Sequence, residues 1–253
     1  MTILEGKGVT KYFGGLAAVS NVDFKVDTGE VLGLIGPNGA GKTTLFNLIS
    51  ATLTPTEGDI KFKGQDIAGS KPYKVCRMGV ARTFQTVKIF ANMPVLNNVL
   101  LGSYYGTSRK ISSPDAMGEA SELLNFVGLS AMISIPAKDL TLANQKRLEI
   151  ARALATGPEL LLLDEIMEGL NPTEVAQAME LINRIREKGI TIVMIEHVMK
   201  AIMTLCGRIL VLHHGEKIAE GTPQEIATSK TVMKIYLGDK AHAGSSQPGY
   251  VLR

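Results

Sequence analysis

The residues with the clearest chemistry form a glycine-rich loop that ends in a lysine and a threonine. Residues 36–43 read Gly-Pro-Asn-Gly-Ala-Gly-Lys-Thr and match the pattern GxxxxGK[ST] in full. Glycines let backbone N–H groups approach a phosphate without a Cβ in the way. Lys42 is expected to place its charge on the β- and γ-phosphates, and the Thr43 hydroxyl to ligate Mg²⁺. The loop predicts a site for a nucleoside triphosphate with Mg²⁺.

Two consecutive carboxylates follow an apolar run in the second half of the chain. Residues 160–163 are all leucine, and Asp164 and Glu165 come directly after them. In a protein with this phosphate loop, the first acid reaches Mg²⁺, often through water. The second acid can polarise the water that attacks the γ-phosphate, and GTPases and small kinases do not usually carry it. The pair indicates nucleotide hydrolysis; the alternative is that Glu165 is a solvated loop acid.

Two further polar residues, His197 and Gln85, could sense the nucleotide. His197 follows the apolar residues 192–195 and Glu196, at the edge where open α/β sheets place their ligands. It is either structural or a hydrogen-bonding partner of the γ-phosphate. Gln85 closes the segment 79–85, where its amide could complete the Mg²⁺ shell or simply lie on the surface. The residue pattern leaves both alternatives open.

The elements that must position these residues alternate between strands and helices. Residues 31–35 and 190–195 are short, β-rich apolar runs typical of buried parallel strands. A helix is expected from about residue 42 to 51, directly after the phosphate loop. Another begins after Asn171, which suits the cap position, with Pro172 at the first helical position. This order predicts a parallel sheet covered on both faces.

A different pattern lies between the two halves of that sheet. Residues 97–105 and 116–127 are expected to form helices joined by a polar loop, and 144–155 is expected to be helical as well. We therefore expect a mostly helical insert in this part of the chain. The opening of the chain and residues 58–63 are interpreted as strands, and His213-His214-Gly215 as a hairpin turn.

Composition argues against several functional classes. The chain has 253 residues, of which 45% are hydrophobic and 20% charged, as in a globular protein with a core. Aromatic residues make up 5%, tryptophan is absent and the net charge is +3, which argues against a nucleic-acid binder. Two distant cysteines suggest free thiols in a reducing compartment. Without an apolar run of about 18 residues or a signal peptide, we expect an intracellular protein that reaches membranes through partners.

Assembled, these motifs resemble the ATP-binding subunits of ABC transporters, from about residue 3 to 237. The resemblance implies an α/β fold: a P-loop NTPase core with a mainly parallel sheet, an N-terminal antiparallel β subdomain and an inserted α-helical subdomain. It implies one ATPase domain over residues 1–238, with the helical insert at about 86–158. Residues 239–253 are expected to form a flexible tail.

The resemblance also implies roles for individual residues. The phosphate loop corresponds to Walker A, Asp164-Glu165 to Walker B with its catalytic glutamate, His197 to the switch histidine and Gln85 to the Q-loop glutamine. The implied catalytic residues are Lys42, Glu165 and His197, and the implied metal ligands are Thr43, Gln85 and Asp164. Phe13 falls at the aromatic position that stacks on adenine, with Tyr12 as the alternative. The implied contacts with ATP are Phe13, Gly36, Pro37, Asn38, Gly39, Ala40, Gly41, Lys42, Thr43, Thr44, Gln85 and Asp164.

The family signature, which grips the γ-phosphate held by the opposite subunit, departs from its usual form. It normally reads Leu-Ser-Gly-Gly-Gln, and residues 140–144 read Leu-Thr-Leu-Ala-Asn. Thr141 keeps the hydroxyl, whereas Leu142 and Ala143 add side chains where two glycines permit close approach. Asn144 is one methylene shorter than glutamine. We expect Thr141, Ala143 and Asn144 to act in trans, at a site that these departures weaken.

Further segments resemble the cassettes of branched-chain amino-acid importers, in particular the larger of their two ATPase subunits. These segments are residues 12–19, 82–85, 147–154 and 168–172. The resemblance implies ATP and Mg²⁺ as cofactors. It implies a second cassette, two transmembrane permease subunits and an external solute-binding protein as partners, on the cytoplasmic face of the inner membrane. Related importers for urea, amides or aromatic acids share much of this pattern and stay an alternative.

Two rival functions differ from transport driven by ATP hydrolysis. A non-transport cassette protein acting on nucleic acid or ribosomes usually has two cassettes or a long coiled coil, and this chain has one phosphate loop and no sustained heptads. A subunit that binds ATP but hardly hydrolyses it would lack a catalytic acid, and Glu165 argues against that for its own site.

Overall fold

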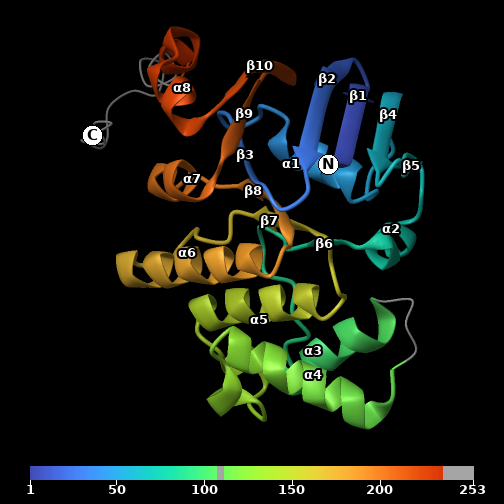
Figure 1. The fold of residues 1–253 in the computed structure, drawn as a ribbon, viewed down its shortest axis with the longest axis vertical. Helices are drawn as coiled ribbons and strands as arrows, with labels where there is room; N and C mark the ends of the chain where they lie inside the picture. Colours follow the sequence, from blue (N-terminus) through green and yellow to red (C-terminus); the bar gives the residue numbers. More distant parts are fainter. Residues whose placement is uncertain (107–110, 236–253) are drawn as a thin grey trace.

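The computed structural model describes residues 1–106 and 111–235 and contains two β-sheets with helices between and around them. The expected tail, residues 239–253, lies outside the described residues, as does part of the polar loop 106–114. Within the described residues, no helix is long and apolar enough to cross a bilayer. Figure 1 shows the antiparallel sheet at one end of the molecule and the helices α3 and α4 at the other.

The larger sheet has six strands in the order β10-β9-β3-β8-β7-β6. Its strands are β3 (Val31–Ile35), β6 (Val80–Arg82), β7 (Leu160–Asp164), β8 (Thr191–Ile195), β9 (Arg208–His213) and β10 (Glu216–Gly221). All neighbouring pairs are parallel except β9 and β10, which form the antiparallel hairpin predicted at His213-His214-Gly215. The predicted mainly parallel sheet is confirmed, and its carboxyl ends lie along one edge.

The smaller sheet is antiparallel and packs over the helix that follows the phosphate loop. Its order is β2-β1-β4-β5, formed by β1 (Thr2–Phe13), β2 (Leu16–Asp27), β4 (Glu57–Phe62) and β5 (Gln65–Asp66). Helix α1 (Lys42–Ile49) buries Leu45, Phe46 and Leu48 in one apolar cluster with residues of both sheets. The two sheets thereby hold α1 and the loop before it on two sides.

Helices cover the other face of the larger sheet. They are α3 (Val95–Tyr105), α4 (Ser113–Phe126), α5 (Leu142–Leu154), α6 (Pro172–Glu187), α7 (Met199–Leu205) and α8 (Pro223–Thr228). Figure 1 shows α5 between the sheet and the pair α3 and α4. One apolar cluster joins these helices to the sheet, and α5 connects the pair α3 and α4 to it.

The continuous apolar strands follow from burial on both faces. In β7, Leu161 and Leu163 belong to the cluster under the helices, whereas Leu160 and Leu162 belong to the cluster around α1. Because side chains alternate between faces, a strand covered on both sides needs apolar residues at every position. Five of five residues in β3, β7 and β8 are buried, as this argument requires.

Most predicted elements are confirmed with small shifts at their ends. Helix α6 begins after Asn171, whose side chain and Glu174 form a capping box. Helix α5 begins two residues earlier than expected, because Thr141 caps it by accepting from the N–H of Asn144. Helices α2 (Pro72–Met78), α7 and α8 were absent from the prediction. They have six or seven residues each, too short for a clear apolar period.

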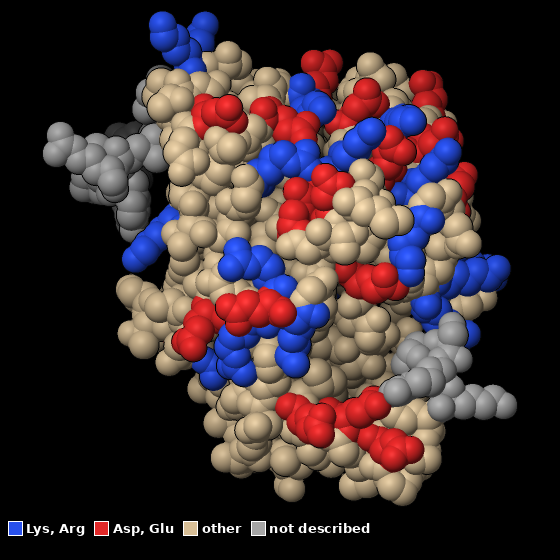
Figure 2. All heavy atoms as spheres, in the orientation of Figure 1, with Lys and Arg blue, Asp and Glu red and all other residues tan. Residues whose placement is uncertain are grey.

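Charged side chains are interspersed over the molecular surface. On the face in Figure 2, acidic and basic residues lie next to one another over the sheet region and around α6, whereas the lower part, over α4, shows acidic residues. This agrees with the near balance of 27 Lys and Arg against 24 Asp and Glu.

Candidate functional site

The phosphate loop joins the carboxyl end of β3 to the start of α1, as predicted. Gly41 stands before the helix at φ 100°, and a Cβ there would lie 2.3 Å from the carbonyl oxygen of Ala18. The position therefore requires glycine both for its backbone angle and for its close approach to β2. The backbone N–H groups at the start of α1 and the helix dipole favour an anion at this point.

Lys42 is a buried cation at the base of this loop. Its Nζ donates to the carbonyl oxygens of Gly36 at 2.8 Å and Pro37 at 3.1 Å. Burial lowers the pKa of Lys42, and the charges of Glu165 and Asp164 oppose that shift. Lys42 thus lies between the phosphate loop and the acidic strand end, where a phosphate chain would bring further negative charge.

A cavity of about 540 Å³ opens over the loop. It brings together the predicted loop residues 38–44, Gln85, Glu165 and His197, whereas the predicted Gly36, Pro37 and Asp164 do not line it. It adds Ala18 and Glu168, which were not predicted. Its lining residues are Ala18, Asn38, Gly39, Ala40, Gly41, Lys42, Thr43, Thr44, Gln85, Glu165, Glu168 and His197. The set combines phosphate-binding backbone, one lysine, hydroxyls and two glutamates, which suits nucleotide hydrolysis.

Asp164 is almost fully buried and has one paired and one unpaired oxygen. Its Oδ2 accepts from Arg82 Nη2 at 3.0 Å, and its Oδ1 has no hydrogen-bond partner among the described residues. Burial raises the pKa of Asp164, and the Arg82 guanidinium opposes this most strongly. A buried acceptor with free lone pairs suits Mg²⁺ or a water bound to it. The free Oδ1 of Asp164 and the exposed hydroxyl of Thr43 are oxygen donors of the kind that Mg²⁺ prefers, so the residues present fit a magnesium site.

Arg82 was not predicted as part of the site. Besides Asp164, it donates through Nη1 to Asn47 Oδ1 at 2.6 Å and Ser50 Oγ at 3.1 Å. Both partners belong to the end of α1, so Arg82 joins the helix of the phosphate loop to the acidic end of β7. In the sequence, Arg82 lies three positions before Gln85, but nothing there indicates that the Arg82 side chain is buried.

The carboxylate of Glu165 contacts both His197 and Gln85. The Glu165 Oε1 lies 3.0 Å from His197 Nε2, and its Oε2 accepts from Gln85 Nε2 at 2.9 Å. Glu165 is 6% exposed and has φ 50°, a left-handed angle that costs a non-glycine residue about 1 kcal/mol or more. The sequence left the roles of His197 and Gln85 open. The geometry places both next to Glu165, the acid expected to activate water.

Phe13 and the residues at 141–144 lie outside this cavity. Phe13 is at the end of β1 with 49% of its surface exposed, and Lys11 Nζ lies 5.6 Å from its ring centre. Thr141 and Leu142 are exposed at the start of α5, whereas Ala143 is buried. The Asn144 amide nitrogen lies 3.3 Å from Met132 Sδ. Residues at the start of α5 therefore present an exposed helix end, separate from the chain's own phosphate loop.

Gly169, in the loop after Glu165, leaves room for Leu142 of the signature. A Cβ added to Gly169 would lie 3.0 Å from Cδ2 of Leu142. Gly169 has φ 76°, so it also occupies an angle that favours glycine. The loop after Glu165 thus provides the space that the leucine in the signature occupies.

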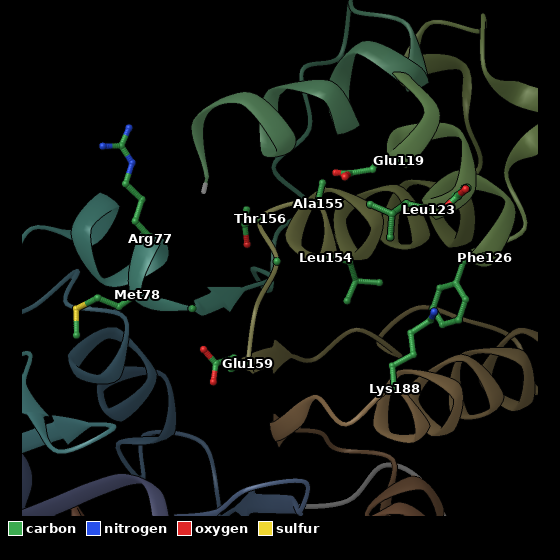
Figure 3. Close-up of a pocket in the computed structure, with 13 residues that line it drawn as sticks. Arg77, Met78, Glu119, Leu123, Phe126, Leu154, Ala155, Thr156, Glu159 and Lys188 are labelled. Atoms are coloured by element: carbon green, nitrogen blue, oxygen red, sulfur yellow. The ribbon is translucent and has the colours of Figure 1, made fainter. Parts of the chain in front are cut away.

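A second cavity, of about 520 Å³, lies at the opposite edge of the sheet (Figure 3). Gly79 and Glu159 line it just before β6 and β7 begin, together with residues of α4 and α5. Figure 3 shows Phe126 of α4 next to Lys188, whose Nζ is 4.8 Å from the ring centre. Open α/β sheets bind their ligands at the carboxyl ends of the strands. We therefore interpret this second cavity as a gap where the helices meet the sheet, not as a ligand site.

Buried charges around Glu165 also escaped prediction. Lys146 and Glu196 are 6% and 3% exposed, and Glu149 of α5 accepts from the backbone N–H of Lys88 at 3.1 Å. Burial raises the pKa of Glu196 to about 7, while the charge of Lys146 opposes this and that of Glu165 adds to it. In the sequence, each of these residues is a charged residue within a helical or apolar segment. Its spacing does not show whether the side chain is buried or exposed.

The raised pKa of Glu196 predicts a pH-dependent stability. Its pKa rises from 4.5 to about 7, so the folded chain holds a proton that the unfolded chain has lost between these values. The free energy of unfolding therefore falls as pH rises through this window. Glu196→Gln is expected to gain stability relative to the unmodified chain by about 2 kcal/mol between pH 5 and pH 8. Urea unfolding at several pH values measures this, and a difference that stays constant with pH contradicts it.

The fold and the site together define a nucleotide-hydrolysing cassette built on a phosphate loop. The profile of the family described as "ABC transporter" matches residues 19–168, and that of "Branched-chain amino acid ATP-binding cassette transporter" matches residues 216–242. The chain therefore belongs to the ABC transporter family. As a member it is an ATP-hydrolysing subunit of a transporter, in a family whose cassettes work as dimers with membrane permease subunits.

Similar proteins carry consistent names. The high-affinity branched-chain amino acid transport ATP-binding protein BraF of Pseudomonas aeruginosa is 40% identical, over 94% of this chain and 98% of the relative. The corresponding LivG of Escherichia coli K12 is 39% identical with the same coverage. A solved ADP conformation of an ATP-binding cassette of an ABC transporter has a TM-score of 0.86 and 31% identity, covering 94% of this chain and 99% of that one. The predicted fold class is confirmed.

Proposed function

We propose that this chain powers an importer of branched-chain amino acids by hydrolysing ATP with Mg²⁺. The observation that carries the chemistry is the convergence of Gln85 and His197 on Glu165 beside the phosphate loop. The names of the relatives BraF and LivG support the solute. The profile match over residues 216–242 supports the same transport class.

In this proposal, the phosphate loop, the acidic residues, Gln85, His197 and Phe13 have distinct roles. The loop N–H groups and Lys42 hold the β- and γ-phosphates of ATP. Thr43, Asp164 and Gln85 hold Mg²⁺, which supplies charge neutralisation on those phosphates when bound. Glu165 accepts a proton from the attacking water, and His197 holds the carboxylate of Glu165 and donates to the γ-phosphate. Phe13 stacks on adenine.

The second half of each ATP site comes from another cassette. Thr141, Ala143 and Asn144 lie at the start of α5, where Thr141 is exposed and the helix N–H groups attract an anion. We propose that they contact the γ-phosphate held by the partner cassette, and that two cassettes enclose two ATP molecules head to tail. ATP then favours the closed dimer and its hydrolysis releases it, which supplies the movement.

Two transmembrane permease subunits are the proposed partners on the side of Gln85 and the helical insert. The segment after Gln85 and the end of α3 expose apolar side chains: Phe90 at 48%, Met93 at 39% and Tyr105 at 68%. Exposed aromatic residues of this kind favour a protein interface. The chain is then peripheral on the cytoplasmic face of the inner membrane, and an external solute-binding protein acts through the permease.

We propose one ATPase domain over residues 1–238, with the helical insert at about 86–158. The support is that α3, α4 and α5 share one apolar cluster with the larger sheet, so the insert has no separate core. Phe126 of α4 lies 4.4 Å from the guanidinium of Arg184 on α6, which adds a contact between insert and sheet layer.

Affinity purification of the tagged chain from detergent-solubilised membranes of its host tests the proposal. Mass spectrometry is expected to identify two polytopic membrane proteins and a second cassette. Mutating Phe90 and Tyr105 to Ser is expected to reduce recovery of the membrane proteins, whereas Tyr73→Ser, a change of similar exposure on α2, serves as the comparison. Recovery of only soluble partners or of ribosomes would contradict the transport function.

The altered signature gives a prediction for the assembled complex. Changing Leu142 and Ala143 to Gly and Asn144 to Gln is expected to raise its ATPase rate by about two- to tenfold, because glycine N–H groups approach a phosphate more closely. Steady-state phosphate release with saturating ATP measures the rate, and the single change Leu142→Ala serves as the partial step. An unchanged rate in the triple variant shows that these side chains do not hinder the site in trans.

A further inference from the structure

The turn that carries Glu165 has an unusual backbone and must be held in place. It spans residues 165–168, between the end of β7 and the start of α6. Glu165 has φ 50° although it is not glycine, and its N–H donates to the carbonyl oxygen of Ile195 at 2.9 Å. A left-handed angle of this type persists only where surrounding contacts over-determine it. The neighbouring elements show which contacts these are.

Lys146 of α5 holds the carbonyl side of the turn. Its Nζ donates to the carbonyl oxygen of Glu165 at 3.0 Å and to that of Glu168 at 2.6 Å. The side chain is 6% exposed, so its charge is removed from water and depends on these acceptors. A lysine ammonium has three donors, and two of them are used on the two ends of one turn.

Glu196 holds the same turn by its N–H side. This residue follows β8 and is 3% exposed. Its Oε1 accepts from the backbone N–H of Met167 at 2.9 Å. A buried ammonium therefore donates to two carbonyls of the turn, and a buried carboxyl oxygen accepts from an N–H between them, so both kinds of backbone group in the turn are held.

We propose that Lys146 and Glu196 are positioning residues for hydrolysis, which fix the backbone of Glu165 so that its carboxylate stays against His197 and Gln85. This inference rests on the proposed role of Glu165 as the acid that activates water. Neither residue lines the cavity, so both act through the turn and not on the nucleotide. A shift of about 1 Å in a catalytic group costs about 100-fold in rate, which gives the scale of the effect.

Lys146 also connects the two functions that this chain has in a dimer. It lies on α5, whose first residues are proposed to contact the ATP held by the partner cassette. The same helix, through Lys146 Nζ, holds the turn with the chain's own catalytic acid. A movement of α5 when the partner's nucleotide binds would reach Glu165 through this side chain.

The test compares Lys146→Met, Lys146→Arg and Glu165→Gln in the assembled transporter. We expect Lys146→Met to lower kcat by about 10- to 100-fold and to leave the Kd for a fluorescent ATP analogue within about twofold of the unmodified complex. Lys146→Arg keeps donors and is expected to recover part of kcat. In a Glu165→Gln background, adding Lys146→Met is expected to lower kcat no further, because the group that it positions is already absent.

If Lys146→Met does not fold, a second pair of variants tests whether these residues position Glu165. Glu196→Gln keeps an oxygen acceptor for the Met167 N–H, whereas Glu196→Leu removes it. We expect Glu196→Leu to lose at least tenfold more kcat than Glu196→Gln, again at unchanged Kd. Unchanged kcat in both Lys146→Met and Glu196→Leu, or equal losses of kcat and ATP affinity, overturns the inference. Unchanged turnover in Glu165→Gln instead refutes the role of Glu165 itself.

Discussion

Glu165→Gln is expected to lower ATP turnover by about 10²- to 10⁴-fold while ATP binding is kept. The amide is similar in size and can still contact His197 and Gln85, but it does not accept a proton from the attacking water. Because hydrolysis no longer releases the closed state, ATP is expected to trap a dimer of cassettes. Phosphate release measures turnover, and size-exclusion chromatography with ATP measures the dimer.

The matched control for this prediction is Glu180→Gln. Glu180 is exposed on α6 and takes no part in the cavity, so the same chemical change there is expected to leave turnover within about twofold. Wild-type turnover in Glu165→Gln would remove this residue from the mechanism. Loss of ATP binding in the same variant would show that the carboxylate acts in binding and not in the chemical step.

Lys42→Ala is expected to weaken ATP binding by about 100-fold. The lysine is buried at the base of the loop, 7% exposed, and its ammonium is the cation that the phosphate loop directs towards the β- and γ-phosphates. A charge-assisted hydrogen bond contributes about 1.5 to 3 kcal/mol, and each 1.4 kcal/mol is tenfold in affinity. Titration with a fluorescent ATP analogue and Mg²⁺ measures the Kd.

Lys188→Ala is the control for this second prediction. Lys188 lines the other cavity, beside Phe126, so removing the same type of cation there is expected to leave the Kd unchanged. If Lys42→Ala binds ATP with the affinity of the unmodified chain, or if both variants lose affinity equally, then the phosphate loop is not the nucleotide site.

The parts of the site that could be predicted are those whose functional residues are consecutive in the sequence. Residues 36–43 are consecutive, and the strand before and helix after them follow from the apolar pattern and the glycines. Asp164 ends β7 and Glu165 directly follows it, and parallel strands bring their carboxyl ends to one edge of the sheet. The contact between these two distant segments therefore followed from topology.

The remaining contacts depend on side-chain directions that a single sequence does not give. Gln85 and His197 reach Glu165 from two different strand ends, and their role stayed open until the distances were known. Arg82 and Lys146 are charged residues that turn inward, against the usual preference of such residues for solvent. Only the packing of α1 and α5 on the sheet shows which buried oxygens they meet.

The most direct test of the central claim is uptake into proteoliposomes that contain the purified complex, with ATP and Mg²⁺ enclosed on the side of the cassettes. We expect labelled leucine, isoleucine or valine, supplied outside with the solute-binding protein, to accumulate only when ATP is present. The complex with Glu165→Gln is expected to accumulate none. Normal ATP hydrolysis without accumulation of any of the three amino acids would contradict the proposed function.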